Sequence, residues 1–303
     1  MLTLINSTLQ DVCRKEKIGY QSLEGVLERQ IKQEVNWDEF ETLEVLGMDE
    51  IALKKGHKDF VVIVTCKVAD RLDLLAVLPN RKKATVKQFL SSIPLSLRDS
   101  IQSVCSDMYD GYINAVKEVL GERVVVVIDR FHVAQKYRGA IDDLRKKELK
   151  RLKKELADQE YANLKGAMWA LRKKKEDLDA EQNTVLETLF KYSSDLKQAY
   201  EFQQQLTQIF DQKISRSQAD RDIQRWMKKV RKTKLSCFDS FLKTLEHHYE
   251  LILNYFDQRL NSGFIEGLNN KIKVIKRRCY GLFNPKNLFQ RIYLDLNGFE
   301  LYV

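Results

Sequence analysis

The sequence changes its pattern near residue 135, and this change limits the folds open to the chain. From residue 135 to residue 256 there is no proline, the only glycines are Gly139 and Gly166, and no stretch has the pattern of a strand. Leu, Phe, Tyr and Trp recur often enough for helices to pack against one another. We predict an all-helical block, with helices at about 138–158, 160–177, 181–192, 194–213, 217–232 and 236–256.

Before this block the pattern is that of strands. Strands are predicted at 43–48, 60–67 and 72–78, with short connections, and at 101–106 after a helix at 85–91. A helix at 110–120 then leads to a β-branched run at 123–128, typical of a strand buried on both faces. Short connections followed by helical crossovers predict an α/β fold with a mixed sheet.

Three of the predicted strands are followed by an aspartate, namely Asp49, Asp107 and Asp129. Ligands of open α/β sheets bind beyond the carboxyl ends of the strands, so Asp49 and Asp107 converge if their strands are neighbours. Glu266, on a later helix, can complete a set of hard oxygen ligands for one or two Mg²⁺ ions. Such ion pairs catalyse phosphoryl transfer. An aspartate at a strand end is also a common turn or cap residue, so the prediction depends on the order and context of the acids.

The helix that carries Glu266 is strongly basic. No other acid occurs between Glu266 and Asp295, so its bases are not paired along the helix and indicate a polyanion as partner. At helical spacing one face is apolar, with Phe264, Leu268, Ile272 and Ile275. The predicted DNA-binding residues are Asn269, Asn270, Lys273, Lys276, Arg277 and Arg278.

The charge of the whole chain supports a nucleic-acid partner. The formal net charge is +9, and the bases concentrate at 138–175 and 213–291. Clustered cations gain affinity for nucleic acid by releasing its counterions. No apolar run approaches the length of a membrane span, and the five cysteines lack metal-binding spacing. We therefore predict a cytoplasmic, nucleoid-associated protein with no membrane partner and no zinc site.

The first 40 residues predict two short helices joined by a turn at Gly19. Ser7 and Gln10 form a possible capping box before the first helix, and the second begins near Ser22. A DNA-binding helix-turn-helix and an ordinary helical hairpin both fit this pattern.

Four motifs, in this order, resemble those of the DDE transposases of the ISL3 insertion-sequence family. They are Met48-Asp49-Glu50-Ile51-Ala52 with Lys55-Gly56-His57, Ser106-Asp107-Met108-Tyr109 with Tyr112 and Ala115-Val116, Val127-Ile128-Asp129-Arg130-Phe131-His132-Val133, and Glu266 to Lys273 with Lys276-Arg277 and Gly281. The resemblance spans residues 9 to 296. It implies a ribonuclease-H-like core interrupted by a helical insertion, in which Asp49, Asp107 and Glu266 match the metal-binding triad.

The implied cofactor is Mg²⁺, with two ions bound and Mn²⁺ as a substitute. The implied partners are double-stranded DNA, as element ends and as target, and further copies of the chain, since synapsis of two ends favours a dimer. The sequence departs from the family in two places. We expect the family's amino-terminal zinc-binding segment to be missing, and Asn261-Ser262-Gly263 stands where the family tends to have a hydroxyl residue followed by Asn.

We predict four parts: a helix-turn-helix-like segment at 1–40, the first part of the core at 41–135, the helical insertion at 136–256, and the closing part with Glu266 at 257–303. The predicted function is Mg²⁺-dependent cleavage of DNA at element ends and strand transfer into target DNA. Two alternatives remain: a truncated, inactive copy that binds DNA, and a ribonuclease-H-like nuclease or resolvase.

Four further residues have two interpretations each. Asp129 is an additional metal ligand or second-shell acid, or it caps the helix that begins near Phe131. His132 belongs to the same shell or has a packing role. Trp169 and Trp226 stack on unpaired bases, or belong to the core of the helical block.

Overall fold

The computed structural model describes residues 1–54, 58–69, 71–259 and 263–302, and for residues 54, 58, 258 and 263–266 it describes the backbone alone. The chain folds into two compact units. Unit 1 comprises Met1–Val127 and Leu260–Val303, and unit 2 comprises Ile128–Arg259. No helix of the described residues is long and apolar enough to cross a membrane.

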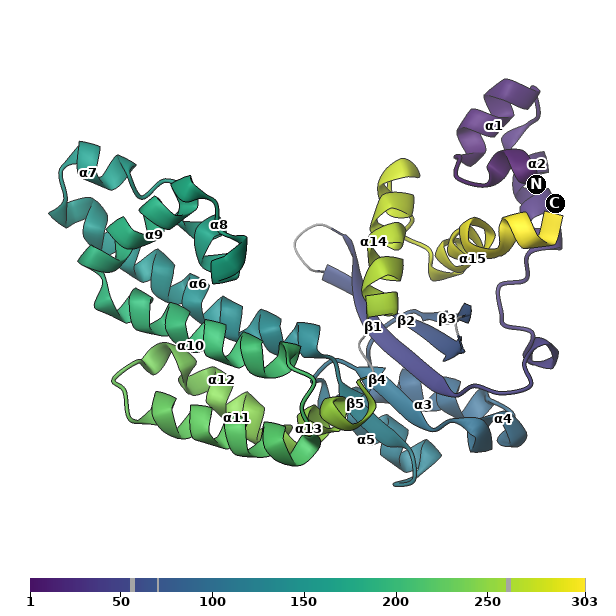
Figure 1. The fold of residues 1–303 in the computed structure, drawn as a ribbon. Helices are drawn as coiled ribbons and strands as arrows, with labels where there is room; N and C mark the ends of the chain where they lie inside the picture. Colours follow the sequence, from purple (N-terminus) through teal and green to yellow (C-terminus); the bar gives the residue numbers. More distant parts are fainter. Residues whose placement is uncertain (55–57, 70, 260–262, 303) are drawn as a thin grey trace. The chain divides into compact units, whose positions relative to one another are not determined.

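Unit 1 is built on a five-stranded mixed sheet (Figure 1). The strands are β1 (Val45–Lys54), β2 (Lys58–Val68), β3 (Arg71–Leu78), β4 (Ser103–Ser106) and β5 (Val125–Ile128), in the order β3-β2-β1-β4-β5. β2 is antiparallel to both β1 and β3, whereas β4 is parallel to β1. This arrangement, with the long helical stretch that follows β5, confirms the predicted fold class.

The first strand was predicted to end at Met48, but β1 continues to Lys54. Its second half pairs with β2 as far as Lys54, which lies opposite Lys58, and Asp49 lies opposite Ile63. Ile51 in this half is only 5% exposed, so burial of every second side chain continues past the two acids. Asp49 is therefore a residue within a strand and not a turn residue at its end.

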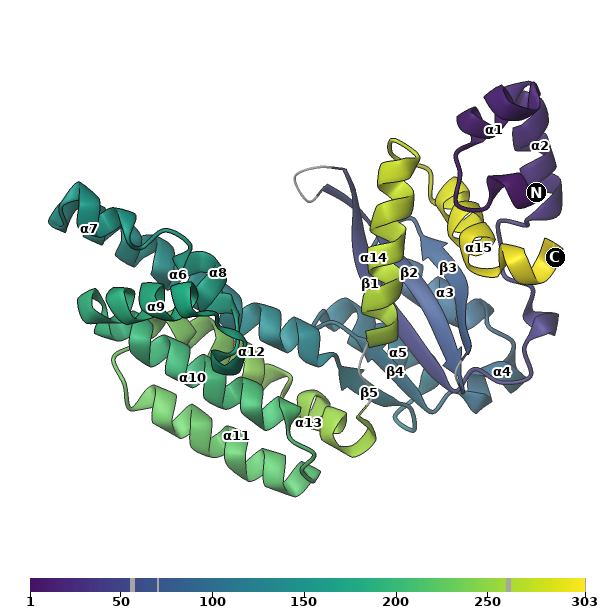
Figure 2. The same cartoon turned by 45° about the horizontal axis from the view of Figure 1, so that its top comes forward.

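Helices cover both faces of the sheet in unit 1 (Figure 2). α14 (Gly263–Arg278) and α15 (Pro285–Tyr302) pack on the face that carries Ile51, Val61 and Ile63, to which they contribute Leu268, Ile272, Ile275, Leu288, Phe289 and Ile292. The other helices of the core are α3 (Lys83–Ser92), α4 (Leu95–Ser100) and α5 (Asp110–Leu120). The hydroxyl of Tyr112 in α5 donates to Glu50. Asp49, the residue before Glu50, points to the α14 face, and successive residues of a strand point to opposite faces. α5 therefore covers the face opposite α14.

The amino-terminal residues form a helical hairpin on α15. A short 3-10 helix (Leu2–Leu4) precedes α1 (Leu9–Glu16) and α2 (Tyr20–Gln30), and a second 3-10 helix follows at Trp37–Glu39. The cap of α1 is Thr8, not Ser7 as predicted. An apolar cluster joins the hairpin to Leu294 of α15, with Leu4, Val12, Leu23, Leu27 and Ile31. Contact of this hairpin with DNA stays a prediction.

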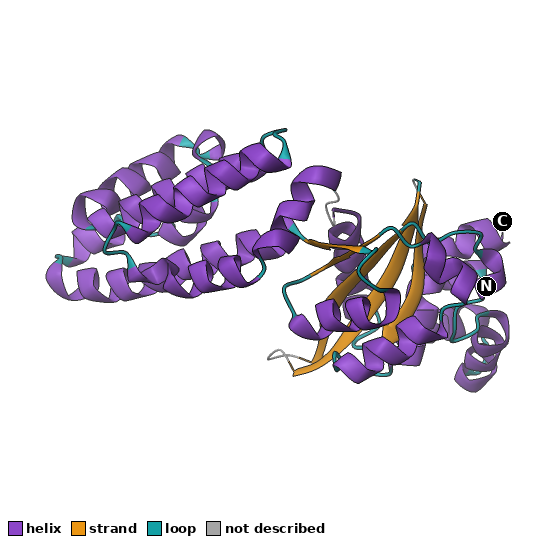
Figure 3. Cartoon of the chain, turned by 90° about the horizontal axis from the view of Figure 1, so that it is seen from below, coloured by secondary structure: helices purple, strands orange, loops and turns teal. Residues whose placement is uncertain are grey.

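From Asp129 to Arg259 the chain forms helices and loops only (Figure 3). The helices are α6 (Arg130–Glu155), α7 (Asp158–Ala162), α8 (Ala167–Arg172), α9 (Ala180–Tyr192), α10 (Ser194–Asp211), α11 (Arg216–Arg231), α12 (Asp239–His247) and α13 (Tyr249–Gln258), with 3-10 turns at Lys175–Asp177 and Ser236–Phe238. Two predicted helices are each divided. The helix at 160–177 is interrupted before α8, where Gly166 has a φ of 90°, and the helix at 236–256 is interrupted at His248.

The two tryptophans of unit 2 differ in their surroundings. Trp226 is 2% exposed and its indole N–H donates to the Phe202 carbonyl at 2.9 Å, so it belongs to the core. Trp169 is 61% exposed. Its position leaves the stacking interpretation open for this residue.

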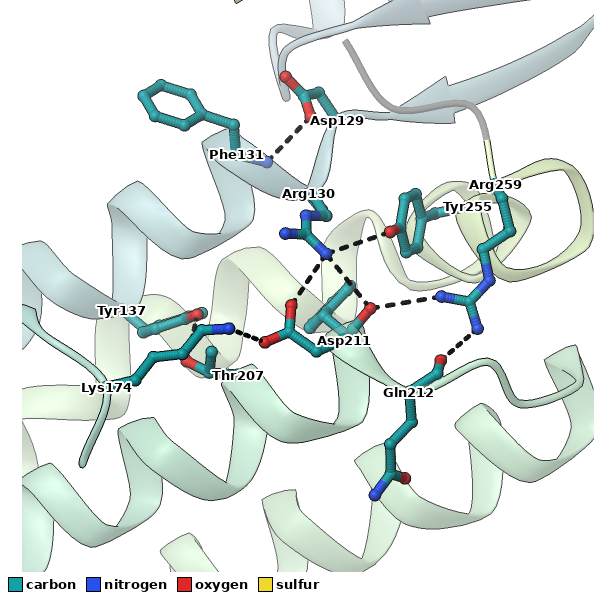
Figure 4. Close-up of polar contacts among 11 residues, drawn as sticks. Asp129, Arg130, Phe131, Tyr137, Lys174, Thr207, Asp211, Gln212, Tyr255 and Arg259 are labelled. Carbon is teal, nitrogen blue, oxygen red and sulfur yellow. Dashed lines mark hydrogen bonds and ion pairs between the residues drawn. The ribbon is translucent and has the colours of Figure 1, made fainter. Parts of the chain in front are cut away.

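The first and last helices of unit 2 are tied to the same end of α10 (Figure 4). Arg130, the first residue of α6, donates to Asp211 at 3.0 Å and lies 3.4 Å from the hydroxyl of Tyr255 in α13. Arg259, directly after α13, donates to the Phe210 carbonyl at 3.3 Å. The first residue of α6 and the residue after α13 therefore meet at the same end of α10.

Candidate active site

Asp49 and Asp107 lie on neighbouring strands, at the level where β4 ends. The parallel register of β1 and β4 pairs Met48 with Ser106. Asp49 follows Met48 within β1, and Asp107 follows Ser106 directly after the end of β4. Both side chains are half-buried. Asp107 starts the turn from β4 into α5, and its Oδ1 accepts the backbone N–H of Tyr109 at 3.0 Å. The expectation that the two strands are neighbours is met.

Asn269 holds α14 against β1 at the level of Asp49. The Asn269 side chain is 7% exposed, and its Nδ2 donates to Oδ2 of Asp49. Two turns further along the helix, Nζ of Lys276 donates to the carbonyls of Ala52 and, at 3.2 Å, of Leu53. The backbone of Glu266 lies in α14 about one turn before Asn269, and its side chain lies outside the described residues.

The oxygen atoms at this edge fit a hard divalent cation. Oδ1 of Asn269 is buried and has no hydrogen-bond partner among the described residues. An acceptor buried in this way is costly unless a cation or donor reaches it. This amide oxygen and the carboxylates of Asp49 and Asp107 are ligands of the type that Mg²⁺ prefers.

The six predicted DNA-binding residues of α14 fall into two groups. Asn270, Lys273 and Arg277 are exposed. Asn269 and Lys276 instead bind β1, and Arg278 pairs with the fully buried carboxylate of Asp295 in α15. Residues 269 and 276 flank the buried stripe of the helix, and burial lowers the pKa of Lys276. The periodicity alone does not separate such boundary positions from exposed ones.

Asp129 is the cap of α6 (Figure 4). It is 3% exposed, and its Oδ1 accepts the backbone N–H of Phe131 at 2.9 Å. His132 is half-buried and packs edge-on against the Phe131 ring, with centroids 5.6 Å apart. Of the two interpretations offered for Asp129, the structure shows the capping role. A role of Asp129 or His132 near the metal stays a prediction.

A second polar group, to which the sequence pattern assigns no role, surrounds Glu50. The buried hydroxyl of Tyr112 donates to Oε1 of Glu50 at 2.9 Å, and Nη1 of Arg81 donates to Oε2 at 3.1 Å. Burial and the adjacent Glu50 carboxylate raise the pKa of Tyr112, so the phenol remains a donor at neutral pH. The signal in the sequence was that Glu50 alternates with the apolar residues Met48 and Ala52, which share one face if the strand continues past Met48.

Comparisons with known proteins agree with the motif pattern. The family model for the ISL3 group of DDE transposases, described as "Transposase", matches residues 46–292. The transposase for insertion sequence element IS1001 of Bordetella parapertussis is 26% identical over 297 residues, which are 97% of this chain and 71% of the relative. The transposase for insertion sequence element IS1557 of Mycobacterium tuberculosis (strain ATCC 25618 / H37Rv) is 25% identical over 307 residues, or 95% of this chain and 68% of the relative. The family match covers β1, β4, the helical insertion and all of α14, and the chain therefore belongs to the ISL3 family of DDE transposases.

Proposed function

We propose that this transposase cleaves DNA at the ends of its own insertion sequence and joins the freed ends to target DNA, with Asp49, Asp107 and Glu266 as the metal-binding triad. The observation that carries the proposal is the register of β1 and β4 together with the contact of Asn269 with Asp49. The register brings two carboxylates to one edge. The contact fixes α14 beside them, about one turn from Glu266.

The proposed triad would hold two Mg²⁺ ions, which supply charge stabilisation at the phosphate and a lower pKa for the attacking water when bound. Asn269 orients the Asp49 carboxylate through its N–H and offers Oδ1 on its other side. The exposed Lys273 and Arg277 then hold backbone phosphates along α14, and Asn270 donates to a phosphate oxygen or sugar.

The proposed reaction has two displacements at phosphorus. In the first, a water oxygen attacks the phosphate at the element end, the bond from phosphorus to the 3′-oxygen breaks, and that oxygen leaves as the 3′-hydroxyl. In the second, this hydroxyl loses its proton and attacks a target phosphate, and the target's own 3′-oxygen leaves and is protonated. The first step hydrolyses one phosphodiester, and the second replaces one phosphodiester by another. Neither step needs an oxidant or a nucleotide cofactor.

The test is the Asp107→Asn variant in a donor-end cleavage assay with Mg²⁺. This change keeps the size of the side chain and removes one anionic ligand, so cleavage should fall by orders of magnitude. Asp99→Asn is the matched control, because Asp99 is 79% exposed and precedes β4 at the opposite edge of the sheet. Equal cleavage by wild type and Asp107→Asn would contradict the assignment of the triad.

A nuclease or resolvase would use the same carboxylates with water in every step. Strand-transfer products on a supercoiled target distinguish the two reactions, and we expect them from this chain. We also propose that residues 136–256 act as an inserted domain and that two copies of the chain bind two element ends together. Sedimentation of the protein with and without end DNA tests the second proposal, because it gives the number of copies of the chain in the complex.

A further inference from the structure

A cationic side chain lies at the same edge of the sheet as Asp49 and Asp107, but on the face opposite α14. Arg81 follows β3, whose last residue, Leu78, pairs with Val62, and Val62 in turn pairs with Glu50. The end of β3 is therefore level with the acids of β1. Because successive residues of a strand point to opposite faces, Glu50 and its partner Arg81 lie across the sheet from Asp49.

The guanidinium of Arg81 is held in place on three sides. Its Nη1 donates to Glu50 at 3.1 Å, and its Cζ lies 5.0 Å from the ring centroid of Phe60 and 5.5 Å from that of Tyr109. Tyr109 is itself bonded to Asp107 through its backbone N–H. Arg81 thus contacts the residue directly after Asp49 and the residue two positions after Asp107.

The exposure of the pair differs between its two members. The Glu50 side chain is 11% exposed, whereas that of Arg81 is 50% exposed. A guanidinium has five N–H donors, and the hydrogen bond to Glu50 uses one of them among the described residues. Since Tyr112 also donates to Glu50, the carboxylate does not depend on Arg81 alone for a partner.

We propose that Arg81 binds a DNA phosphate beside the carboxylates of the active site, and that Glu50 and Tyr112 are positioning residues that hold it there. The inference rests on the proposed DNA cleavage by this edge of the sheet. A planar guanidinium fixed against two rings loses little side-chain entropy on binding and can offer two parallel N–H groups to phosphate. With Lys273 and Arg277 on the other face, cations then flank the acids on both faces of the sheet, and the DNA backbone passes the end of β4.

The experiment measures the salt dependence of DNA affinity for the full chain on a labelled 30-base-pair duplex. Each phosphate contact contributes about 0.9 to the slope of log K against log salt. Arg81→Gln should flatten the slope by about 0.9, Lys273→Gln by a similar amount, and the double variant by about 1.8, because the two residues bind different phosphates. Arg71→Gln is the matched control: Arg71 also pairs with an acid, Asp73, and lies 5.8 Å from a ring, but it begins β3 at the opposite edge.

Cleavage with Mg²⁺ on the same variants tests the position of the phosphate. Arg81→Gln should lower the cleavage rate about tenfold or more. Arg81→Lys keeps the charge and therefore the slope of log K against log salt. Its cleavage rate should still fall, because lysine lacks the two parallel N–H groups. If Glu50 acts through Arg81, adding Glu50→Gln to Arg81→Gln should cost no further rate.

The outcomes separate this inference from the proposed function. A flattened slope for Lys273→Gln with a wild-type slope for Arg81→Gln would overturn the role of Arg81 and leave the α14 surface standing. Wild-type slopes for both would contradict the proposed DNA surface itself. Equal effects of Arg81→Gln and Arg71→Gln would mean a general loss of charge and would also overturn the inference. If Arg81→Gln does not fold, a wild-type cleavage rate for Arg81→Lys would overturn the role of Arg81.

Discussion

Replacing Asn269 by Asp tests the geometry of the candidate site without any assay of activity. The substitution removes the N–H donor to Asp49 and places a second carboxylate against the first. A hydrogen bond to a charged group contributes about 1.5 to 3 kcal/mol. Two carboxylates about 4 Å apart repel by roughly 4 kcal/mol at an effective dielectric constant of about 20. Asn269 is 7% exposed, so solvent screens little of this repulsion.

We therefore expect Asn269→Asp to destabilise unit 1 by about 5 kcal/mol at pH 7.5 without divalent metal, or roughly 10 to 20 °C in melting temperature. The repulsion raises the pKa of the carboxylate pair in the folded state, so the loss should shrink as the pH falls towards 5. Mg²⁺ should also reverse part of it, since a ligand at 100 times its Kd stabilises the folded state by about 2.7 kcal/mol.

The assay is thermal unfolding in EDTA and in Mg²⁺, at constant ionic strength, with Asn270→Asp as the control. Asn270 is the next residue of α14 and is exposed, so the same change of charge there should alter stability by less than about 0.5 kcal/mol. If Asn269→Asp melts with wild type in EDTA, Asn269 does not lie against Asp49. If Mg²⁺ raises the melting temperature of both variants and wild type equally, the pair is not a metal site.

Three further predictions follow from contacts in unit 1. Changing both Lys273 and Arg277 to Gln should flatten the salt dependence of DNA affinity by about 1.8 with an unchanged melting temperature, because both are exposed; a lower melting temperature would instead indicate a structural role. Asp295→Asn removes the charge of a fully buried side chain that is surrounded by the guanidiniums of Arg278 and Arg291 and by the backbone N–H of Asn6. The change should lower the free energy of unfolding in urea by about 3 to 5 kcal/mol and make residues 1–31 sensitive to protease. A wild-type rate of proteolysis would contradict this. The pKa of Tyr112 is raised in the folded protein, so its contribution to stability is present below about pH 10 and is lost as the pH rises further. The free energy of unfolding of Tyr112→Phe should therefore fall less steeply than that of wild type between about pH 9 and 11. Equal slopes for the two proteins would count against this.

The architecture was largely predictable from the sequence because it follows from local patterns. The β-branched run before Asp129 and the nearly all-apolar run that begins at Phe60 predicted strands, and the long stretch without proline predicted helices. The order of the acid-bearing motifs was equally local. Their resemblance to one transposase family therefore identified the class of the protein before any coordinates.

The tertiary structure decided which face and which depth each polar residue occupies. The extent of β1 depends on pairing with β2, a partner that strand propensity does not specify, so Asp49 moved from the end of a strand to its interior. On α14 the sequence showed a basic row, but only packing against β1 and α15 turned Asn269, Lys276 and Arg278 inward and left Lys273 and Arg277 exposed. The pairing of Arg81 with Glu50 joins residues 31 positions apart on separate elements, and such a contact exists only when the sheet brings the ends of β1 and β3 to the same edge.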